Sequence, residues 1–311
     1  MSNHPVITRV IIVEFSTCFY QAKNIFYRYN PHMLSLTPTY LINGSNEPLS
    51  PLDRGFAYGD GVFRTFVFNL SSFNINHPHI WPLNYQKLVA DCNVLGIVCP
   101  SAELLMSDIS QLLLVDGNVD ELAVIKIIIT RGDGARGYAP PAIATPNRVV
   151  IKSAMPNYPL QNASDGVTLR VCNLRLSHQP RLASIKHLNR LENVMARMEW
   201  QDSQITDGVL LDVNEHVIEC TMSNIFVRFG GTLVTPDLNA CGVAGVTRQR
   251  IIEAAPSLGL VVSVKNISLS ELMQSDEVII CNGIIGAWQV VKISDKTWIK
   301  QSLAQDLKRV L

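Results

Sequence analysis

The sequence is poor in charge and lacks the patterns that mark several protein classes. Only 17% of its 311 residues are charged, and Lys plus Arg equal Asp plus Glu at 26 each. This balance leaves no basic stripe, so no nucleic-acid partner is expected. No apolar run approaches the ~20 residues that a membrane-spanning helix needs, so no membrane partner is expected either. With 47% hydrophobic residues, the chain is predicted to be globular.

Cysteine follows no recognisable pattern. The seven cysteines are Cys18, Cys92, Cys99, Cys172, Cys220, Cys241 and Cys281. Their number is odd and no CxxC pair occurs, so neither a disulfide framework nor a metal site is predicted. A reducing, cytoplasmic location fits this pattern best.

The length of the chain predicts two domains. Residues 1–32 are set aside as an N-terminal extension, because their apolar stretch carries Arg9 and Glu14 and makes a poor signal peptide. A stretch rich in Pro, Asn, Ser and Gly begins near residue 156, which places a linker at 156–163. We therefore predict a smaller domain over 33–155 and a larger one over 164–311.

The hydrophobic pattern changes between strand and helix periods along the chain, which predicts a mixed α/β fold. Strands are expected over residues 39–44, 62–68, 121–130, 147–154, 167–176, 208–213, 215–219 and 276–281. Helices are expected over residues 83–95, 104–114, 188–201, 247–255 and from 303 onward.

One lysine stands between small and apolar neighbours. Lys186 directly precedes a predicted helix in which Leu188, Leu191, Met195 and Met198 share one face. A desolvated lysine loses basicity and can form a Schiff base with a carbonyl. A solvated lysine at a helix start is the commoner case, so this stretch alone does not decide between the two.

Three further segments carry polar groups of a kind that binding sites use. Glu219 lies in an apolar run, where a carboxylate needs a cationic partner or solvent. Gly242–Arg248 is a Gly-rich turn entering a helix, whose N–H groups and dipole suit phosphate. Arg131–Pro141 carries arginines on a Gly-rich loop, which suits carboxylates. The alternatives are a solvent-facing acid, N-capping by Thr247 and a solvated loop.

The lysine, the acid and the helix entrance, with a second turn at Asn282-Gly283, are the groups needed to hold pyridoxal 5′-phosphate. With them the sequence resembles the class IV aminotransferases, the fold-type IV pyridoxal-phosphate enzymes, over about residues 40–291. The motifs that carry the resemblance are, in chain order, Asp53–Gly55 with Tyr58–Gly61, Arg131–Tyr138, Ile185–Glu192, Glu219–Phe226, Gly242–Arg248 and Ile280–Gly283. The resemblance implies an α/β (α+β) fold of two mixed α/β domains, with the cofactor between them.

The resemblance also implies a role for each matching position around the cofactor. Lys186 matches the lysine that holds the cofactor covalently and transfers protons. Glu219 matches the acid at the pyridine nitrogen. Val246 and Thr247 match the phosphate-binding turn.

Two further pairs of residues match positions with a known role. Asn282 and Gly283 match a second phosphate-binding turn. Arg136 and Tyr138 stand where the family binds substrate carboxylates. Because this loop is expected to act across a subunit interface, the resemblance implies a homodimer.

One segment departs from the family pattern. The family has His-x-x-Arg-Leu, with its arginine for the cofactor phosphate, where this chain has Asn84-Tyr85-Gln86-Lys87-Leu88. Lys87 in that role would pair with phosphate as a point charge and would lack the guanidinium fork. A lower cofactor affinity is expected from this change.

Within the family, the sequence is most similar to the lyases that act on 4-amino-4-deoxychorismate. The resemblance implies elimination of pyruvate from this small molecule to give 4-aminobenzoate for folate biosynthesis. A D-amino-acid or branched-chain aminotransferase would share the fold, but the D-amino-acid enzymes carry histidine where Tyr138 stands. A non-catalytic binding protein is the remaining alternative, favoured only by Lys87.

Overall fold

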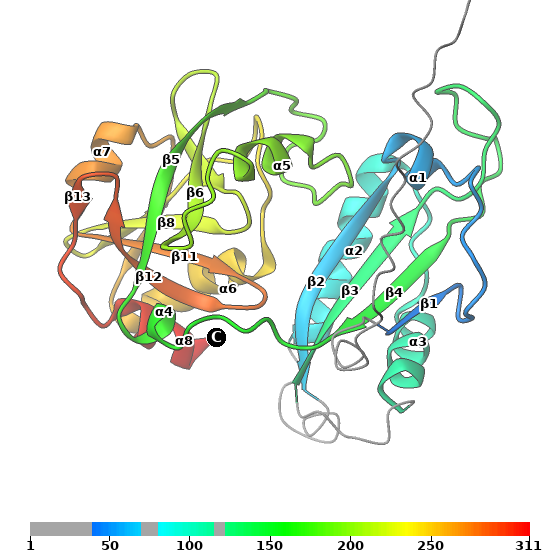
Figure 1. Cartoon of the computed structure of the whole chain (residues 1–311), viewed down its shortest axis with the longest axis horizontal. Helices are drawn as coiled ribbons and strands as arrows, with labels where there is room; N and C mark the ends of the chain where they lie inside the picture. The colour runs from blue at the N-terminus through cyan, green and yellow to red at the C-terminus, as the bar shows by residue number, and fades with distance from the viewer. Residues whose placement is uncertain (1–38, 70–79, 115–121) are drawn as a thin grey trace, which may run out of the picture. The chain divides into compact units, whose positions relative to one another are not determined.

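The computed structural model describes residues 39–69, 80–114 and 122–311 (Figure 1). Residues 38–311 form one compact unit. The predicted extension over residues 1–32 lies outside the described residues. In the part of the chain that the structure describes, no helix is both long and apolar enough to span a bilayer.

The first half of this unit is built on a four-stranded antiparallel sheet. In the order in which they pair, its strands are β1 (Thr39–Ile42), β4 (Arg148–Ser153), β3 (Leu122–Thr130) and β2 (Gly61–Asn69). Two helices pack on it, α2 (Ile80–Leu95) against β2 and α3 (Ala102–Leu114) against β1 and β4 (Figure 1). Ile125, Ile127 and Ile129 alternate along β3 and are fully buried, which is why this segment folds as a strand with one face in the core.

The second half is built on a nine-stranded mixed sheet, ordered β10-β9-β8-β11-β12-β5-β6-β7, with β13 paired to β12. Its strands are β5 (Val167–Leu176), β6 (Ile205–Asp212), β7 (Val217–Cys220), β8 (Asn224–Phe229), β9 (Thr232–Thr235), β10 (Val261–Val264), β11 (Glu277–Asn282), β12 (Gly286–Ile293) and β13 (Lys296–Thr297). The neighbours β5–β6, β5–β12 and β9–β10 run parallel, and the other pairs run antiparallel. The predicted mixed α/β fold is confirmed.

Short helices complete the chain. They are α1 (Arg54–Tyr58), α4 (Gln161–Ser164), α5 (Leu191–Arg197), α6 (Val246–Ala254), the 3₁₀ turn η3 (Ala255–Leu258), α7 (Leu269–Gln274) and α8 (Leu303–Val310). The division between the sheets falls where a linker was predicted, because β4 ends at Ser153 and β5 begins at Val167. The assignment of two domains and their linker stays a prediction.

Helix α5 is shorter than predicted. It begins at Leu191 rather than at residue 188, because Arg190 has a non-helical φ of −111°. Of the apolar side chains predicted to share one helical face, Leu188 precedes the helix, and Leu191 and Met198 are 74% and 71% exposed. The helix therefore presents an apolar surface to its surroundings.

A buried carboxylate fastens helix α1 to the first sheet. Asp53 is fully buried and caps α1 by accepting a hydrogen bond from Phe56 N at 3.0 Å. Its other oxygen accepts from Thr130 Oγ1 at 2.5 Å and from Asn147 Nδ2 at 2.9 Å. One side chain thus satisfies three donors from three segments.

We predict that Asp53→Ala lowers the free energy of unfolding by about 3 kcal/mol, because it removes a helix cap and strands two buried donors. Denaturant unfolding of the purified protein measures the loss. Asp295→Ala is the matched control, since Asp295 is exposed and should change stability by less than about 0.5 kcal/mol. Equal losses in the two variants would contradict the proposed role of the network.

Candidate active site

A cavity of about 410 Å³ brings together residues from distant parts of the sequence. Six of the predicted site residues line it, namely Lys186, Glu219, Val246, Thr247, Asn282 and Gly283. The described residues around the cavity do not include the other three predicted positions, Lys87, Arg136 and Tyr138. The sequence motifs thus converge, but not completely.

Lys186 is held by its main chain, and its amine is withdrawn from water. Its N–H donates to Asp91 Oδ2 at 3.2 Å, and its carbonyl accepts from Phe63 N at 2.9 Å. The amine lies 4.8 Å from the centre of the Phe63 ring. Burial lowers the pKa of the Lys186 amine to about 8, an effect that the charge of Glu219 partly offsets. A substantial fraction of this amine is therefore neutral near physiological pH.

Glu219 lies on β7 and is only 4% exposed. Its Oε2 accepts a hydrogen bond from Val243 N at 2.9 Å. Burial raises the pKa of the Glu219 carboxyl, while the Val243 N–H and the charges of Arg190 and Lys186 act in the opposite direction. The acid that the sequence placed in an apolar run thus has cationic neighbours and does not face solvent.

The entrance to α6 presents backbone N–H groups to the cavity. Gly245 is the N-cap and contributes no side chain, so the first-turn N–H groups of Val246 and Thr247 have no capping acceptor. The turn is fastened from behind by Asn224, whose Oδ1 accepts from Gly245 N at 3.1 Å. A Cβ on Gly245 would come within 2.4 Å of that oxygen, so the close approach requires glycine. Because Thr247 lies inside the helix, it is not the N-cap.

The turn after β11 is shaped by its own side chain. Asn282 Nδ2 donates to the carbonyl of Met222 at 3.2 Å, and Asn282 Oδ1 accepts from Ile284 N at 2.9 Å. Both ends of the amide are therefore engaged by the chain. Gly283 backs onto β2, where an added Cβ would lie 2.8 Å from Thr65 O. The turn can offer backbone groups to a ligand more readily than the Asn282 side chain.

Lys87 is engaged elsewhere. Its amine pairs with Asp91 and donates to the carbonyl of Ser184 at 3.0 Å. Asp91 also pairs with Arg64, so one fully buried carboxylate serves two cations. Burial lowers the pKa of Lys87, and the charge of Asp91 opposes this shift. In this arrangement Lys87 supports the segment that carries Lys186 and does not line the cavity.

Three cationic residues that the sequence interpretation missed line the cavity, namely Arg64, which pairs with Asp91, Arg190 and Arg250. Arg250 lies on α6, four residues after Val246, and is half-buried. Its guanidinium forms no hydrogen bond or ion pair with the described residues, and burial lowers its pKa. The available signals were their spacings, since Arg190 follows Lys186 by four residues and Arg250 lies one helical turn after the Gly-rich entrance.

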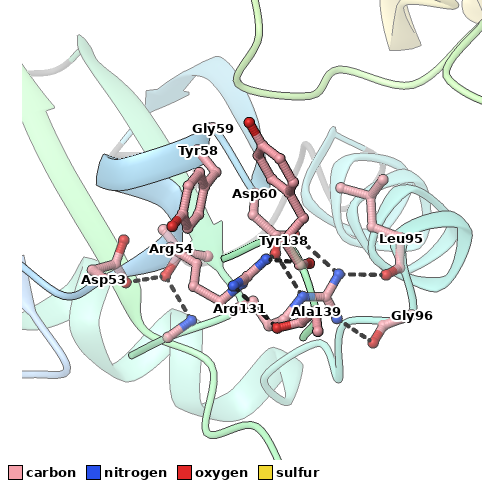
Figure 2. Close-up of polar contacts among 12 residues, drawn as sticks. Asp53, Arg54, Tyr58, Gly59, Asp60, Leu95, Gly96, Arg131, Tyr138 and Ala139 are labelled. Carbon is pink, nitrogen blue, oxygen red and sulfur yellow. Dashed lines mark hydrogen bonds and ion pairs between the residues drawn. The ribbon is translucent and has the colours of Figure 1, made fainter. Parts of the chain in front are cut away.

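The main chain of the loop after β3 is held in place by hydrogen bonds from the Arg54 side chain (Figure 2). Arg54 and Arg131 both bind the carboxylate of Asp60, with N–O distances of 2.9 and 2.7 Å. Arg54 also donates to the carbonyl of Tyr138 at 3.0 Å, and the ring of Tyr138 packs edge-on against Tyr58 at 5.6 Å.

The predicted substrate residues of this loop are open to solvent. Tyr138 is 86% exposed, and Arg136 is exposed and makes no hydrogen bond to the described chain. The structure therefore fixes the backbone of the loop but places neither side chain in the cavity of the same chain.

Comparison with known proteins agrees with this geometry. The family model for amino-transferase class IV matches residues 66–293. An aminodeoxychorismate lyase from Vibrio harveyi is 36% identical over 82% of this chain and 91% of its own length. A D-alanine aminotransferase from Listeria monocytogenes is 25% identical over 81% of this chain and 85% of its own.

A solved structure is similar over nearly all of the described chain. The crystal structure of 4-amino-4-deoxychorismate lyase from Pseudomonas aeruginosa has a TM-score of 0.80 and 38% identity, covering 87% of this chain and 97% of that one. The predicted family and fold are thereby confirmed. On the cavity, the family match and these relatives together, the chain belongs to the class IV aminotransferase family.

Proposed function

We propose that this chain is a pyridoxal-phosphate-dependent lyase that releases pyruvate from 4-amino-4-deoxychorismate and leaves 4-aminobenzoate. The observation that carries the proposal is that Lys186 and Glu219, 33 positions apart, line one cavity with the entrance of α6. The identities of 36% and 38% to lyases of this name support the choice of reaction.

The groups around the cavity fit the cofactor. A desolvated amine, a buried carboxyl and a helix N-terminus without a capping side chain match its aldehyde, its ring nitrogen and its phosphate. When bound, the cofactor supplies an aldehyde for covalent attachment and a ring that accepts electrons.

Lys186 has two tasks in this proposal. Its amine would hold the cofactor through the aldehyde and would be free for a second role once the substrate is bound. The freed amine then removes the proton from the amine-bearing carbon of the substrate, as a general base. A pKa of about 8 suits this task, because a base works best when its pKa lies near the working pH.

Glu219 holds a proton at the ring nitrogen of the cofactor. Its raised pKa favours a shared proton there, and the hydrogen bond from Val243 fixes the orientation of the carboxyl. With a proton held there by Glu219, the bound cofactor would supply a ring that takes up negative charge, and the enolpyruvyl group would leave the substrate as pyruvate.

The substrate carries carboxylates, for which the cavity offers Arg190. We also propose that a second copy of the chain brings Arg136 and Tyr138 to the site, because both are exposed and neither lines the cavity of its own chain. The exposed apolar side chains of Phe56, at 76%, and Met195, at 60%, are suited to such a homodimer interface. The free cysteines among the described residues support a cytosolic location.

We assign the cation at the phosphate end of the cavity to Arg250 rather than to Lys87. Arg250 lines the cavity one helical turn from the N–H groups of Val246 and has no partner among the described residues. Lys87 is held by Asp91 and by the carbonyl of Ser184. The guanidinium missing at residue 87 is thus replaced from another element.

The experiment that tests the function measures both reactions of the family on one preparation. The wild-type protein should bind the cofactor, turn yellow, and release pyruvate and 4-aminobenzoate in equal amounts, with little amino transfer to 2-oxoglutarate. Lys186→Ala should lose the colour and more than about 100-fold of the activity, because the attachment point and the base are the same atom.

Lys265→Ala serves as the control, since Lys265 is exposed and outside the cavity. Predominant amino transfer would show that the protein is an aminotransferase and not a lyase. A wild-type protein that stays colourless with added cofactor would support the binding protein instead.

The pH dependence of cofactor attachment should report the shifted amine. Only the neutral amine attacks an aldehyde, so the attachment rate should rise with pH around a midpoint near 8 and level off about one pH unit above it, where Lys186 is mostly deprotonated. The charge of Glu219 raises the pKa of Lys186, so Glu219→Gln should move the midpoint to lower pH. Stopped-flow absorbance on the cofactor-free protein measures the rate. A midpoint near the ordinary value of 10.5 would show that the amine is solvated.

The role of Arg250 should appear in affinity for the phosphate group alone. Arg250→Gln should weaken binding of pyridoxal 5′-phosphate by about 10-fold or more, since a hydrogen bond to a charged group contributes about 1.5–3 kcal/mol. Affinity for pyridoxal, which has no phosphate, should stay unchanged. Quenching of protein fluorescence gives both dissociation constants.

Two companion variants make this test specific. Arg250→Lys should recover part of the loss, because it keeps the charge but not the fork. Lys87→Gln should have the smaller effect on phosphate affinity. The reverse order of Lys87→Gln and Arg250→Gln would return the assignment to Lys87.

A further inference from the structure

A cluster of metal-ligating side chains lies among residues that do not line the cofactor cavity. Ligand atoms of His178, Asp212 and Cys241 all lie within 4.8 Å of one another. Any three atoms this close share a point within about 2.8 Å of each, and zinc bonds to nitrogen, oxygen and sulfur span about 2.0–2.3 Å. Side-chain movements of about 0.5–0.8 Å would therefore bring all three atoms into bonding range.

We propose that His178, Asp212 and Cys241 form a binding site for a thiophilic divalent transition-metal ion such as Zn²⁺. Imidazole, carboxylate and thiolate are the ligand types that Zn²⁺ prefers. The proposal does not depend on the function proposed above, because it rests on a different set of residues.

The three ligands come from segments that the fold already holds together. Asp212 ends β6, and its register partner on β5 is Leu176, two residues before His178. Cys241 lies in the loop between β9 and α6. That loop is tied to the His178 segment by the hydrogen bond from Gln179 N to Ala240 O at 2.9 Å. Little ordering would be needed when an ion binds.

The polar contacts of Asp212 leave one oxygen for an ion. Its Oδ1 accepts from the main-chain N–H groups of Asn214 and His216, at 2.9 and 2.8 Å. Its Oδ2 is approached by His178 Nε2 at 2.8 Å and by His216 Nδ1 at 3.4 Å. Because His216 Nδ1 faces the same oxygen, it is placed to hydrogen-bond the carboxylate.

The thiol distinguishes a metal site from an ordinary ion pair. Contact between His178 and Asp212 needs no further partner, but a buried cysteine beside them adds a soft ligand that an ion pair does not use. Burial raises the pKa of Cys241 to about 12, so the group is a thiol until an ion binds. Binding would then release one proton from Cys241 to solvent, as its Sγ exchanges hydrogen for metal.

The site would bear on the loop that orients the predicted acid of the cavity. Cys241 is followed by Gly242, whose carbonyl accepts from Ser184 N at 2.9 Å, and by Val243, which donates to Glu219. An ion at Cys241 would thus fix the start of this loop. The sequence alone predicted no metal site, because the three ligands are separated by 34 and 29 positions and form no short motif.

The test is a titration of the full-length protein with Co²⁺, which reports its ligands by absorbance. We expect one Co²⁺ per chain, with visible bands of a tetrahedral site, a thiolate-to-metal charge-transfer band, and displacement of both by Zn²⁺. Cys241→Ser should abolish the charge-transfer band and weaken affinity at least as much as loss of an outer partner does, by about 10–100-fold. Cys99→Ser is the matched control, since Cys99 is a free cysteine outside the cluster.

A second variant guards against misfolding of the buried substitution. His178→Ala changes an exposed side chain and should weaken Co²⁺ binding with only a small change in the melting temperature of the metal-free protein, because Asp212 keeps its hydrogen bonds from the N–H groups of Asn214 and His216. Zn²⁺ should raise the melting temperature of the wild type and of Cys99→Ser but not of Cys241→Ser, because a ligand that binds only the folded state stabilises it. Absence of saturable binding, or binding that survives both Cys241→Ser and His178→Ala, would overturn the proposal.

Discussion

The active-site geometry depends on one short segment, residues 184–188, that main-chain hydrogen bonds fasten on both sides. On one side the carbonyl of Lys186 accepts from Phe63 N on β2. On the other side Ser184 exchanges hydrogen bonds with Gly242 and Ala244, at 2.9 and 3.1 Å. These bonds fix the backbone from which the Lys186 side chain enters the cavity.

Ser184 shows that this position carries a local cost. Its φ of 67° lies in the left-handed region that non-glycine residues seldom occupy. Three contacts oppose that cost, since its hydroxyl donates to Leu238 O at 2.8 Å and its main chain makes the two bonds to the 242–244 loop. The same loop donates from Val243 to Glu219. One turn therefore orients both the lysine segment and the acid.

Much of the fold and of the site could be read from local patterns. A lysine among apolar residues, an acid in an apolar run and a Gly-rich helix entrance are each visible in a short window, but only the family resemblance gave Lys186, Glu219 and Val246 their expected roles. The strands β3 and β5 were found from apolar periodicity. Patterns of this kind are local, and they persist whatever the rest of the chain does.

What could not be read depends on contacts between distant residues. The match of Lys87 to the phosphate arginine was made by position, and sequence does not show that Asp91 and Ser184 engage its amine. Helix α5 begins only at Leu191 because the main chain of residues 184–188 is hydrogen-bonded to other segments. Residues held in this way cannot also make helical hydrogen bonds. The position of Arg136 could not be predicted either, because a sequence motif does not show whether its side chain lines the site of its own chain or that of a second copy.

The buried carboxylate of Asp91 gives a physical reason for the departure at residue 87. A carboxylate with no exposed surface needs cationic partners, and Arg64 and Lys87 supply them. The charge of Asp91 raises the pKa of Lys186 and that of Arg64 lowers it, so the effects of these two charges on the amine partly cancel. The amine nitrogen of Lys87 donates hydrogen bonds to both Asp91 and the Ser184 carbonyl. The planar guanidinium of an arginine would have to use different nitrogens for the two acceptors. The lysine at residue 87 therefore supports the segment that carries Lys186, while Arg250 on α6 lines the cavity without a partner among the described residues.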